Sequence, residues 1–210
     1  MLRQEAEQGI GRVIATPHFY PQQDSPERFL QRRESAWQMM RTELSNFGDL
    51  PEISLGAEVL FFFGMSNSEI LQQMTIDGQE SVLVEMPPSP WTDTMFRELE
   101  GIYHNLGLIP IIAHVDRYIQ PFRTHGIPQR LAEMPVMVQA NASFFIRPST
   151  GRMAVNMLKK KQIQLLGSDC HNLTNRPPNL GKAIQQIQKS AGAAAIEYIE
   201  ASQYEILQEP

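Results

Sequence analysis

Short apolar runs recur along the chain and predict the strands of a parallel sheet. Six runs are rich in β-branched residues and nearly continuous in hydrophobicity, rather than alternating between apolar and polar positions. This pattern is typical of strands that are buried on both faces. The six predicted strands cover residues 13–15, 53–55, 82–84, 109–113, 136–138 and 163–166.

Helix signals lie between these runs. Ser25 and Pro26 are typical of an N-cap and a first helical position, and an apolar stripe at helical spacing then continues to Phe47, just before Gly48. We expect Trp37 and the neighbouring residues 39–40 to fill the core. Further helices are predicted at residues 2–8, at 92–106 with Gly107 as the end signal, at 150–161, and twice after residue 180.

Strands and helices thus alternate along the whole chain. This alternation predicts one α/β domain over residues 1–210, either a barrel or a doubly wound sheet. The chain opens on a helix with no strand before it. We therefore expect either an unusual open sheet or a barrel whose first strand is missing.

Composition narrows the choice of partners. The net charge is −5, the pI is about 5.6, and the longest basic run is the lysine triplet at 159–161. Such a chain is unlike a nucleic-acid-binding protein, which needs clustered positive charge. A single cysteine, Cys170, excludes an intrachain disulfide, and no apolar run is long enough for membrane insertion. With a polar N-terminus, the chain is expected to be cytoplasmic.

Potential metal ligands follow several of the predicted strands. Because the carboxyl ends of parallel strands meet at one rim, we expect these side chains to converge there. Glu85 directly follows three apolar residues, and a carboxylate buried there needs a cation beside it. Histidine and carboxylate ligands together suit Mn, Fe or Zn. The predicted ligands are His18, Glu58, Glu85, His114, Asp169 and His171.

Two arginines stand close to these residues in the sequence. Arg117 lies three residues after His114, and Arg176 lies five after His171. A guanidinium beside metals suits a bound anion, and its planar fork matches phosphate oxygens. Metals and arginines together predict phosphate-ester hydrolysis by a metal-activated hydroxide. The remaining histidines, His104 and His125, lie away from the strand ends and are expected to be structural or exposed.

These stretches resemble the PHP superfamily (polymerase and histidinol phosphatase), and within it the manganese-dependent bacterial protein-tyrosine phosphatases of the CpsB/YwqE type. The resemblance runs through nearly the whole chain in the family's order. It is carried by residues 14–18, 56–58, 84–87, 113–118, 139–142 and 167–172, and by Arg176-Pro177-Pro178.

The resemblance implies a distorted (β/α)₇ TIM-like barrel with up to three Mn²⁺ ions. Glu85 would bridge two metals; Glu58 and His114 would share one of those, Asp169 would hold the other, and His18 and His171 would help to hold the third. It implies that Arg117 and Arg176 bind the phosphate of phosphotyrosine. The implied partner is an autophosphorylated bacterial tyrosine kinase that controls capsule or exopolysaccharide export. Whether the chain forms a homo-oligomer is left open.

The chain departs from the family at its start. The family opens with a strand that carries a His-x-His pair, and this sequence begins in the helix that would follow it. The pair would supply two ligands to the metal that Asp169 helps to hold. We therefore expect that metal to be weak or absent, and the first barrel strand to be missing from this chain.

Three alternatives remain open. Cys170 and Arg176 have the Cys-x₅-Arg spacing of thiol-based tyrosine phosphatases, although Asp169 would raise the pKa of the thiol. The chain could instead be a barrel remnant without catalysis. A third alternative is a PHP enzyme for a small phosphomonoester such as histidinol phosphate.

Overall fold

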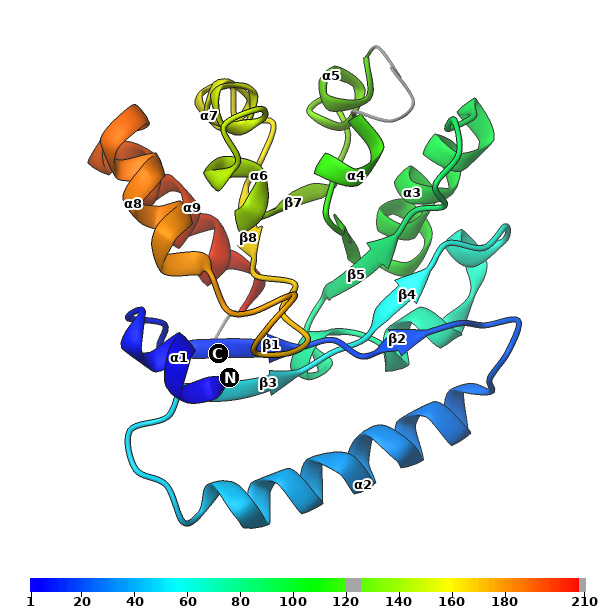
Figure 1. The fold of residues 1–210 in the computed structure, drawn as a ribbon. Helices are drawn as coiled ribbons and strands as arrows, with labels where there is room; N and C mark the ends of the chain where they lie inside the picture. The colour runs from blue at the N-terminus through cyan, green and yellow to red at the C-terminus, as the bar shows by residue number, and fades with distance from the viewer. Residues whose placement is uncertain (120–125, 208–210) are drawn as a thin grey trace.

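The computed structural model describes residues 1–119 and 126–207 and forms an α/β fold around a curled, parallel half-barrel sheet (Figure 1). Every strand pair in these residues is parallel. The pairing order is β1-β3 in one part and β2-β4-β5-β6-β7-β8 in the other. The strands are β1 (Arg12–Ala15), β2 (His18–Phe19), β3 (Glu52–Leu55), β4 (Glu58–Leu60), β5 (Ser81–Glu85), β6 (Ile109–Ile112), β7 (Met137–Asn141) and β8 (Leu165–Gly167).

The two parts of the sheet join at a bend. β1 continues into β2 across Thr16 and Pro17, and the paired β3 continues into β4 across Gly56 and Ala57. Proline has no N–H for the strand ladder, which favours a break there. A Cβ on Gly56 would lie 3.2 Å from Ile76 Cγ1 and 3.3 Å from Thr16 Cγ2, so glycine lets the backbone pass closely. Beyond the bend, His18 and Glu58 are register partners.

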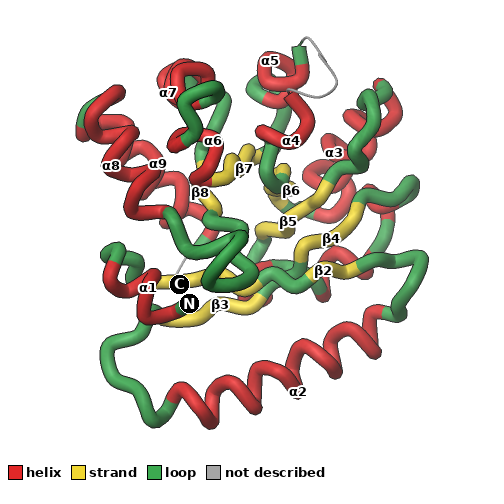
Figure 2. Tube along the Cα trace, viewed as in Figure 1, coloured by secondary structure: helices red, strands yellow, loops and turns green. Residues whose placement is uncertain are grey.

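Helices follow the strands and cover the outer side of the curled sheet, except for α2, which runs alone along the bottom of the view (Figures 1 and 2). All the helices expected from the sequence are present: α1 (Leu2–Glu7), α2 (Pro26–Leu44), α3 (Asp93–Leu106), α7 (Gly151–Lys159), α8 (Leu180–Ala191) and α9 (Ala193–Ile206). The sequence did not predict the short α4 (Asp116–Ile119), α5 (Ile127–Leu131) and α6 (Ala142–Ile146), or the 3₁₀ turns η1 (Met65–Asn67), η2 (Glu69–Gln73) and η3 (Ile76–Gly78).

The two faces of the sheet have different cores. Successive strand residues point to opposite faces, and Val82 and Val84 belong to the large cluster that packs against the helices. A smaller cluster lies on the other face and consists of Ile76, Ile111, Met137, Leu165 and Ile206, with Leu83 packed against it. By the same alternation, Glu85 shares the face of Leu83. The inner face is therefore apolar at the start of the strands and carries polar residues at their ends.

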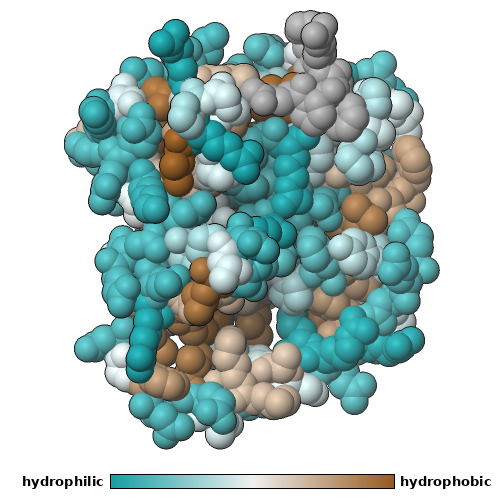
Figure 3. Space-filling model, in the orientation of Figure 1, coloured by the Kyte–Doolittle hydropathy of each residue, from teal (hydrophilic) through white to brown (hydrophobic). Residues whose placement is uncertain are grey.

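Helix α2 is more exposed than the sequence suggested. Phe29 is its one buried residue, and Met39 and Met40 are 74% and 37% exposed, so the expectation that these methionines fill the core was wrong. A cavity of about 270 Å³ separates the helix from β1 and β3, with Trp37 and Leu55 in its lining. Figure 3 shows a hollow with apolar side chains in this lower part of the molecule.

The sheet is open in the described residues. β1 and β8 do not pair with each other there, so the strands form a half-barrel rather than a closed one. This matches the α/β class and the parallel sheet expected from the sequence. Across residues 1–119 and 126–207, we find no helix with the length and apolar character needed to span a membrane.

Candidate metal centre

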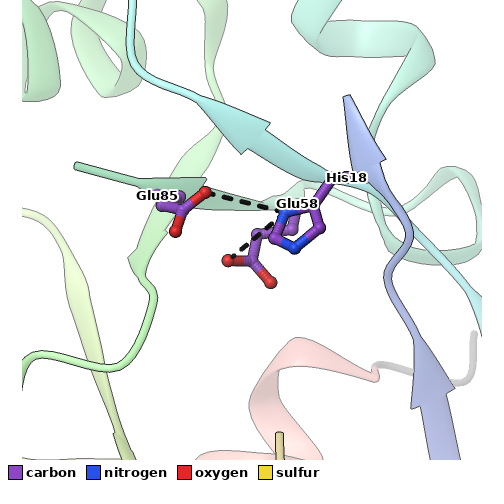
Figure 4. A group of neighbouring side chains, drawn as sticks. All are labelled: His18, Glu58 and Glu85. Atoms are coloured by element: carbon purple, nitrogen blue, oxygen red, sulfur yellow. Dashed lines mark ion pairs between the residues drawn. The ribbon is translucent and has the colours of Figure 1, made fainter. Parts of the chain in front are cut away.

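Three predicted ligands meet at the rim of the sheet. His18 begins β2, Glu58 begins β4 and Glu85 ends β5, and these neighbouring strands bring their side chains together (Figure 4). Nδ1 of His18 lies 3.8 Å from Oε1 of Glu58 and 3.6 Å from Oε2 of Glu85. One potential ligand atom from each residue lies within 4.8 Å of the other two.

The chemistry of this group fits a divalent cation. The side chains of Glu58 and Glu85 are only 8% and 18% exposed, and two carboxylates so close together and so little hydrated repel each other. Nδ1 of His18 is buried and has no hydrogen-bond partner in the described residues, although it faces both carboxylates. A metal ion would satisfy all three groups, and a mixed N/O set suits Mn, Fe or Zn.

His114 extends the group from the end of β6. Its Nε2 lies 2.8 Å from Oε1 of Glu58 and 3.5 Å from Oε1 of Glu85, and the residue is 2% exposed. Its backbone has φ of +34°, an unusual value that is held by a hydrogen bond of 2.5 Å from its N–H to Oε1 of Gln139. Gly167 on β8 leaves room for Gln139, since a Cβ there would lie 2.3 Å from the amide nitrogen.

Tyr118 supports His114, a role that the sequence did not reveal. The Tyr118 hydroxyl accepts a hydrogen bond of 3.0 Å from the Met86 N–H and lies 3.3 Å from Nδ1 of His114. Burial, and then the charge of Glu85, raise the pKa of Tyr118 above its usual value, so the phenol stays protonated. Ligand histidines commonly use their second ring nitrogen in such a contact. The sequence offered one signal for this contact: Tyr118 lies four residues after His114, which is about one helical turn.

Asp169 lies beside this group, among arginines. Arg117 Nη2 contacts Oδ2 of Asp169, and Arg176 Nη2 contacts Oδ1. Arg117 also reaches the ligand group, with its Nη1 3.5 Å from Oε1 of Glu85 and 3.3 Å from Nε2 of His114. Arg117 therefore connects Asp169 with the group that contains Glu85 and His114. Both guanidinium side chains are about 40% exposed, at 40% and 39%, and can be reached from solvent.

His171 stands at the outer edge of the site. Its side chain is 43% exposed, and Nδ1 lies 3.1 Å from the backbone oxygen of Asp169. Its ring centroid is 6.3 Å from that of His18. In the described residues, neither Asp169 nor His171 joins the close group of His18, Glu58 and Glu85. Their assignment as metal ligands stays a prediction.

Two further polar residues, Asn141 and Asp116, form hydrogen bonds between loops at the rim, a role that the sequence did not predict. Asn141 ends β7, and its Nδ2 donates to Oδ2 of Asp169 at 3.4 Å. The N–H of Asn141 donates to Oδ1 of Asp116 at 2.9 Å. Burial raises the pKa of Asp116. These contacts link the loops after β6, β7 and β8.

The thiol chemistry suggested by the Cys-x₅-Arg spacing finds no support in the geometry. Sγ of Cys170 lies 3.7 Å from Oε1 of Glu5, a carboxylate, and Arg176 contacts Asp169. Burial raises the pKa of the Cys170 thiol, and the Glu5 charge adds to this effect. A nucleophilic cysteine needs the opposite shift.

Neither of the other two histidines, His104 and His125, was predicted to be a metal ligand. The ring of His104 on α3 packs edge-on against that of Tyr103, in keeping with the structural role expected for it. His125 lies outside the described residues.

Two curated relatives match most of the chain. Tyrosine-protein phosphatase CpsB of Streptococcus pneumoniae is 25% identical over 211 residues, which cover 92% of this chain and 82% of that protein. Tyrosine-protein phosphatase YwqE of Bacillus subtilis (strain 168) is 23% identical over 206 residues, covering 92% and 76%.

A solved structure shares the fold. It is described as "Crystal structures of YwqE from Bacillus subtilis and CpsB from Streptococcus pneumoniae, unique metal-dependent tyrosine phosphatases". It matches with a TM-score of 0.82 at 19% identity and covers 100% of this chain and 86% of that chain. The sequence profile of the family described as "Capsular polysaccharide synthesis, CpsB/CapC" matches residues 1–207. Because this match spans nearly the whole chain, the protein belongs to the CpsB/CapC family.

Proposed function

We propose that the protein is a metal-dependent phosphatase that hydrolyses phosphotyrosine in a protein substrate. The observation that carries the proposal is the close group of His18, Glu58 and Glu85 with Arg117 directly beside it. Metal ligands next to a reachable guanidinium suit a phosphate ester. The names of the relatives in S. pneumoniae and B. subtilis support tyrosine phosphate as the substrate.

His18, Glu58, Glu85 and His114 are proposed to hold the metal, with Mn²⁺ favoured and Fe or Zn also compatible. The bound metal would supply Lewis acidity toward the phosphoryl oxygens and lower the pKa of a water. Tyr118 would fix the ring of His114 through Nδ1, because its hydroxyl oxygen is within hydrogen-bond distance of that atom and can accept from an Nδ1–H, which leaves Nε2 free to bind the metal. Glu58, which faces both histidines, would keep them oriented toward the same point.

Arg117 and Arg176 are proposed to bind the substrate phosphate. Both face Asp169, whose carboxylate holds the two guanidiniums close together in spite of their like charge. An incoming phosphate would compete with Asp169 for the same N–H groups. Arg117, which already contacts Glu85, would bring that phosphate against the metal group.

Several finer expectations stay predictions. These are the second and third metal ions, at Asp169 and His171, and a complete (β/α)₇ barrel. The tyrosine kinase partner in capsule or exopolysaccharide synthesis is proposed from the family description and the relatives. A single domain and a cytoplasmic location are proposed on the sequence alone, and homo-oligomer formation is left open.

Phosphate release from a phosphotyrosine peptide, with and without Mn²⁺, tests the proposal. We expect Mn²⁺-dependent turnover that EDTA abolishes, and a higher kcat/KM for the peptide than for histidinol phosphate. A preference for histidinol phosphate would instead indicate a small-molecule phosphatase. Metal binding without turnover of either substrate would indicate a protein that has kept the site but not the reaction, and would overturn the proposal.

A further inference from the structure

The segment that carries Asp169, His171 and Arg176 has no helix or strand of its own. It runs from the end of β8 to the start of α8, between residues 168 and 179. Its tip is held by local hydrogen bonds: Oδ1 of Asn172 accepts from the N–H of Asn175 at 2.7 Å and from the N–H of Arg176 at 3.1 Å. The tip is therefore compact, but these contacts do not fix it relative to the sheet.

Helix α1 contacts both ends of this segment. At the first end, Oε1 of Glu5 accepts from the Ser168 hydroxyl at 3.1 Å and lies 3.7 Å from Sγ of Cys170. At the second end, Nε2 of Gln8 donates to the backbone oxygen of Pro178 at 3.2 Å, and its Oε1 accepts from the Gly181 N–H at 2.8 Å. Glu5 lies within α1, and Gln8 is the C-cap residue three positions later.

The contact at Glu5 bears directly on Asp169. Ser168 and Cys170 flank Asp169 and both turn their side chains to Glu5, while the Asp169 carboxylate contacts the two arginines. Asp169 has φ of +49°, a conformation that costs energy for a residue with a side chain and persists only when its surroundings impose it. Glu5 is 2% exposed, so this interaction is made away from solvent.

The contact at Gln8 depends on a close approach between helices. A Cβ on Gly181 would lie 3.1 Å from both Cβ and Cγ of Gln8. Glycine at position 181 thus lets the Gln8 amide reach the backbone of α8 at its first turn. The Gln8 amide thus donates one hydrogen bond and accepts another, and the two bonds fix the direction in which the segment leaves the site.

We propose that Glu5 and Gln8 are positioning residues, and that α1 clamps the 168–179 segment so that Asp169 and Arg176 face the metal group. The inference rests on the proposed function for its catalytic consequence, but the clamp itself can be measured without any reaction. In this proposal, α1 helps to shape the site although it is far from Arg176 in the sequence.

Hydrogen–deuterium exchange tests the clamp. In Gln8→Ala, the Gly181 amide loses its acceptor, and we expect its exchange to speed up about fivefold. Gln8→Glu keeps the acceptor oxygen and loses the donor to Pro178, so the Gly181 amide should stay protected in that variant. Gln4→Ala, on the exposed side of α1, is the matched control and should leave the whole segment unchanged.

Glu5→Ala and Glu5→Gln test the contact beside Asp169. We expect Glu5→Ala to speed exchange across residues 168–179 and to lower kcat/KM for p-nitrophenyl phosphate about tenfold, a loss comparable with the removal of a supporting contact in a metal site. The affinity for Mn²⁺ at His18, Glu58 and Glu85 should stay unchanged. Glu5→Gln retains an acceptor for Ser168 and should recover most of both losses.

The outcomes separate the clamp from the proposed function. Equal exchange in Gln8→Ala, Glu5→Ala and the Gln4→Ala control would overturn the clamp, whatever the enzyme does. Faster exchange in a protein that hydrolyses no phosphate would uphold the clamp and overturn the phosphatase. If the alanine variants fail to fold, the exchange rate of the Gly181 amide in Gln8→Glu is compared with the rate in the wild type. Faster exchange of this amide in Gln8→Glu would contradict the proposal.

Discussion

At the scale of single residues, the meeting of His18, Glu58 and Glu85 could be predicted from the sequence, but the contacts around the site could not. Glu85 stands out because a carboxylate after three apolar strand residues needs a partner. The contact between Tyr118 and His114 depends on a turn in which His114 adopts φ of +34°, and no local pattern encodes that turn. The placement of Asp169 between arginines likewise depends on Arg117 of α4, which is 52 residues away in the sequence.

Tyr118→Phe should weaken the metal centre and the fold together. The variant removes the contact with Nδ1 of His114, and we expect Mn²⁺ affinity to fall by about ten- to a hundredfold. It also leaves the Met86 N–H without that acceptor, which costs about 1–3 kcal/mol of unfolding free energy. Calorimetric Mn²⁺ titration and urea unfolding measure the two effects. Tyr204→Phe, at a tyrosine that is 72% exposed, should change neither.

Cys170→Ala should leave most of the activity in place. The Cys170 thiol has a raised pKa and faces Glu5, so we expect no covalent role for it. Turnover of p-nitrophenyl phosphate with Mn²⁺ should remain within about threefold of the wild type, because the lost contact is one weak S–H donor. Abolished turnover in Cys170→Ala, together with full resistance of the wild type to EDTA, would restore the thiol mechanism.

At the scale of elements, local signals predicted the regular helices well. Gly107 ends α3 with φ of +68°, as the sequence indicated, and Thr92, the first residue of the predicted helix, is its N-cap. The 3₁₀ turns between β4 and β5 were missed because such short turns have no periodic pattern. Periodicity also indicates which face of a helix is apolar, but not whether another part of the protein covers that face. For this reason Met39 on α2 was expected in the core although it is exposed.

Gly101→Ala should destabilise the contact between α3 and η1. A Cβ at position 101 would lie 2.7 Å from Cβ of Ser66, which is buried, so the two elements would have to move apart. We expect a loss of about 1–3 kcal/mol in the free energy of unfolding, measured with urea. The double variant Gly101→Ala with Ser66→Gly removes the clashing atom and should recover much of the loss. An unchanged stability in the single variant would show that α3 does not press on η1.

The same contact should depend on pH through Glu98. Partial burial opposes its charge, but hydrogen bonds from Ser66 and Gly64 outweigh burial and lower the pKa of Glu98. A lowered pKa in the folded state adds stability above the unfolded-state pKa, and this stability is lost as the pH falls through the folded value. Glu98→Gln should therefore cost about 1 kcal/mol at pH 7, a small value because Glu98 is partly exposed.

Urea unfolding of the wild type and Glu98→Gln at pH 7 and at pH 3 checks this dependence. The difference between them should shrink at the lower pH, since the stability that comes from the lowered pKa is lost as Glu98 becomes protonated in the folded state. A difference that is equal at both pH values would mean that the charge of Glu98 contributes nothing.

At the scale of the whole molecule, the alternation of strands and helices was enough to predict a parallel α/β fold. The sequence could not show the curl of the sheet, which arises where β1 bends into β2 and β3 into β4. That bend lies next to His18 and Glu58, which are close to Glu85. We predict that these three residues hold a metal ion.

Calorimetric titration with Mn²⁺ of the wild type and of Glu85→Gln tests this claim most directly. The substitution keeps the size of the side chain but removes its charge, so the fold should persist while the site loses an anionic ligand. We predict saturable Mn²⁺ binding by the wild type and an affinity at least about a hundredfold weaker in Glu85→Gln. Equal affinity in the two proteins, or no binding by the wild type, would contradict the account.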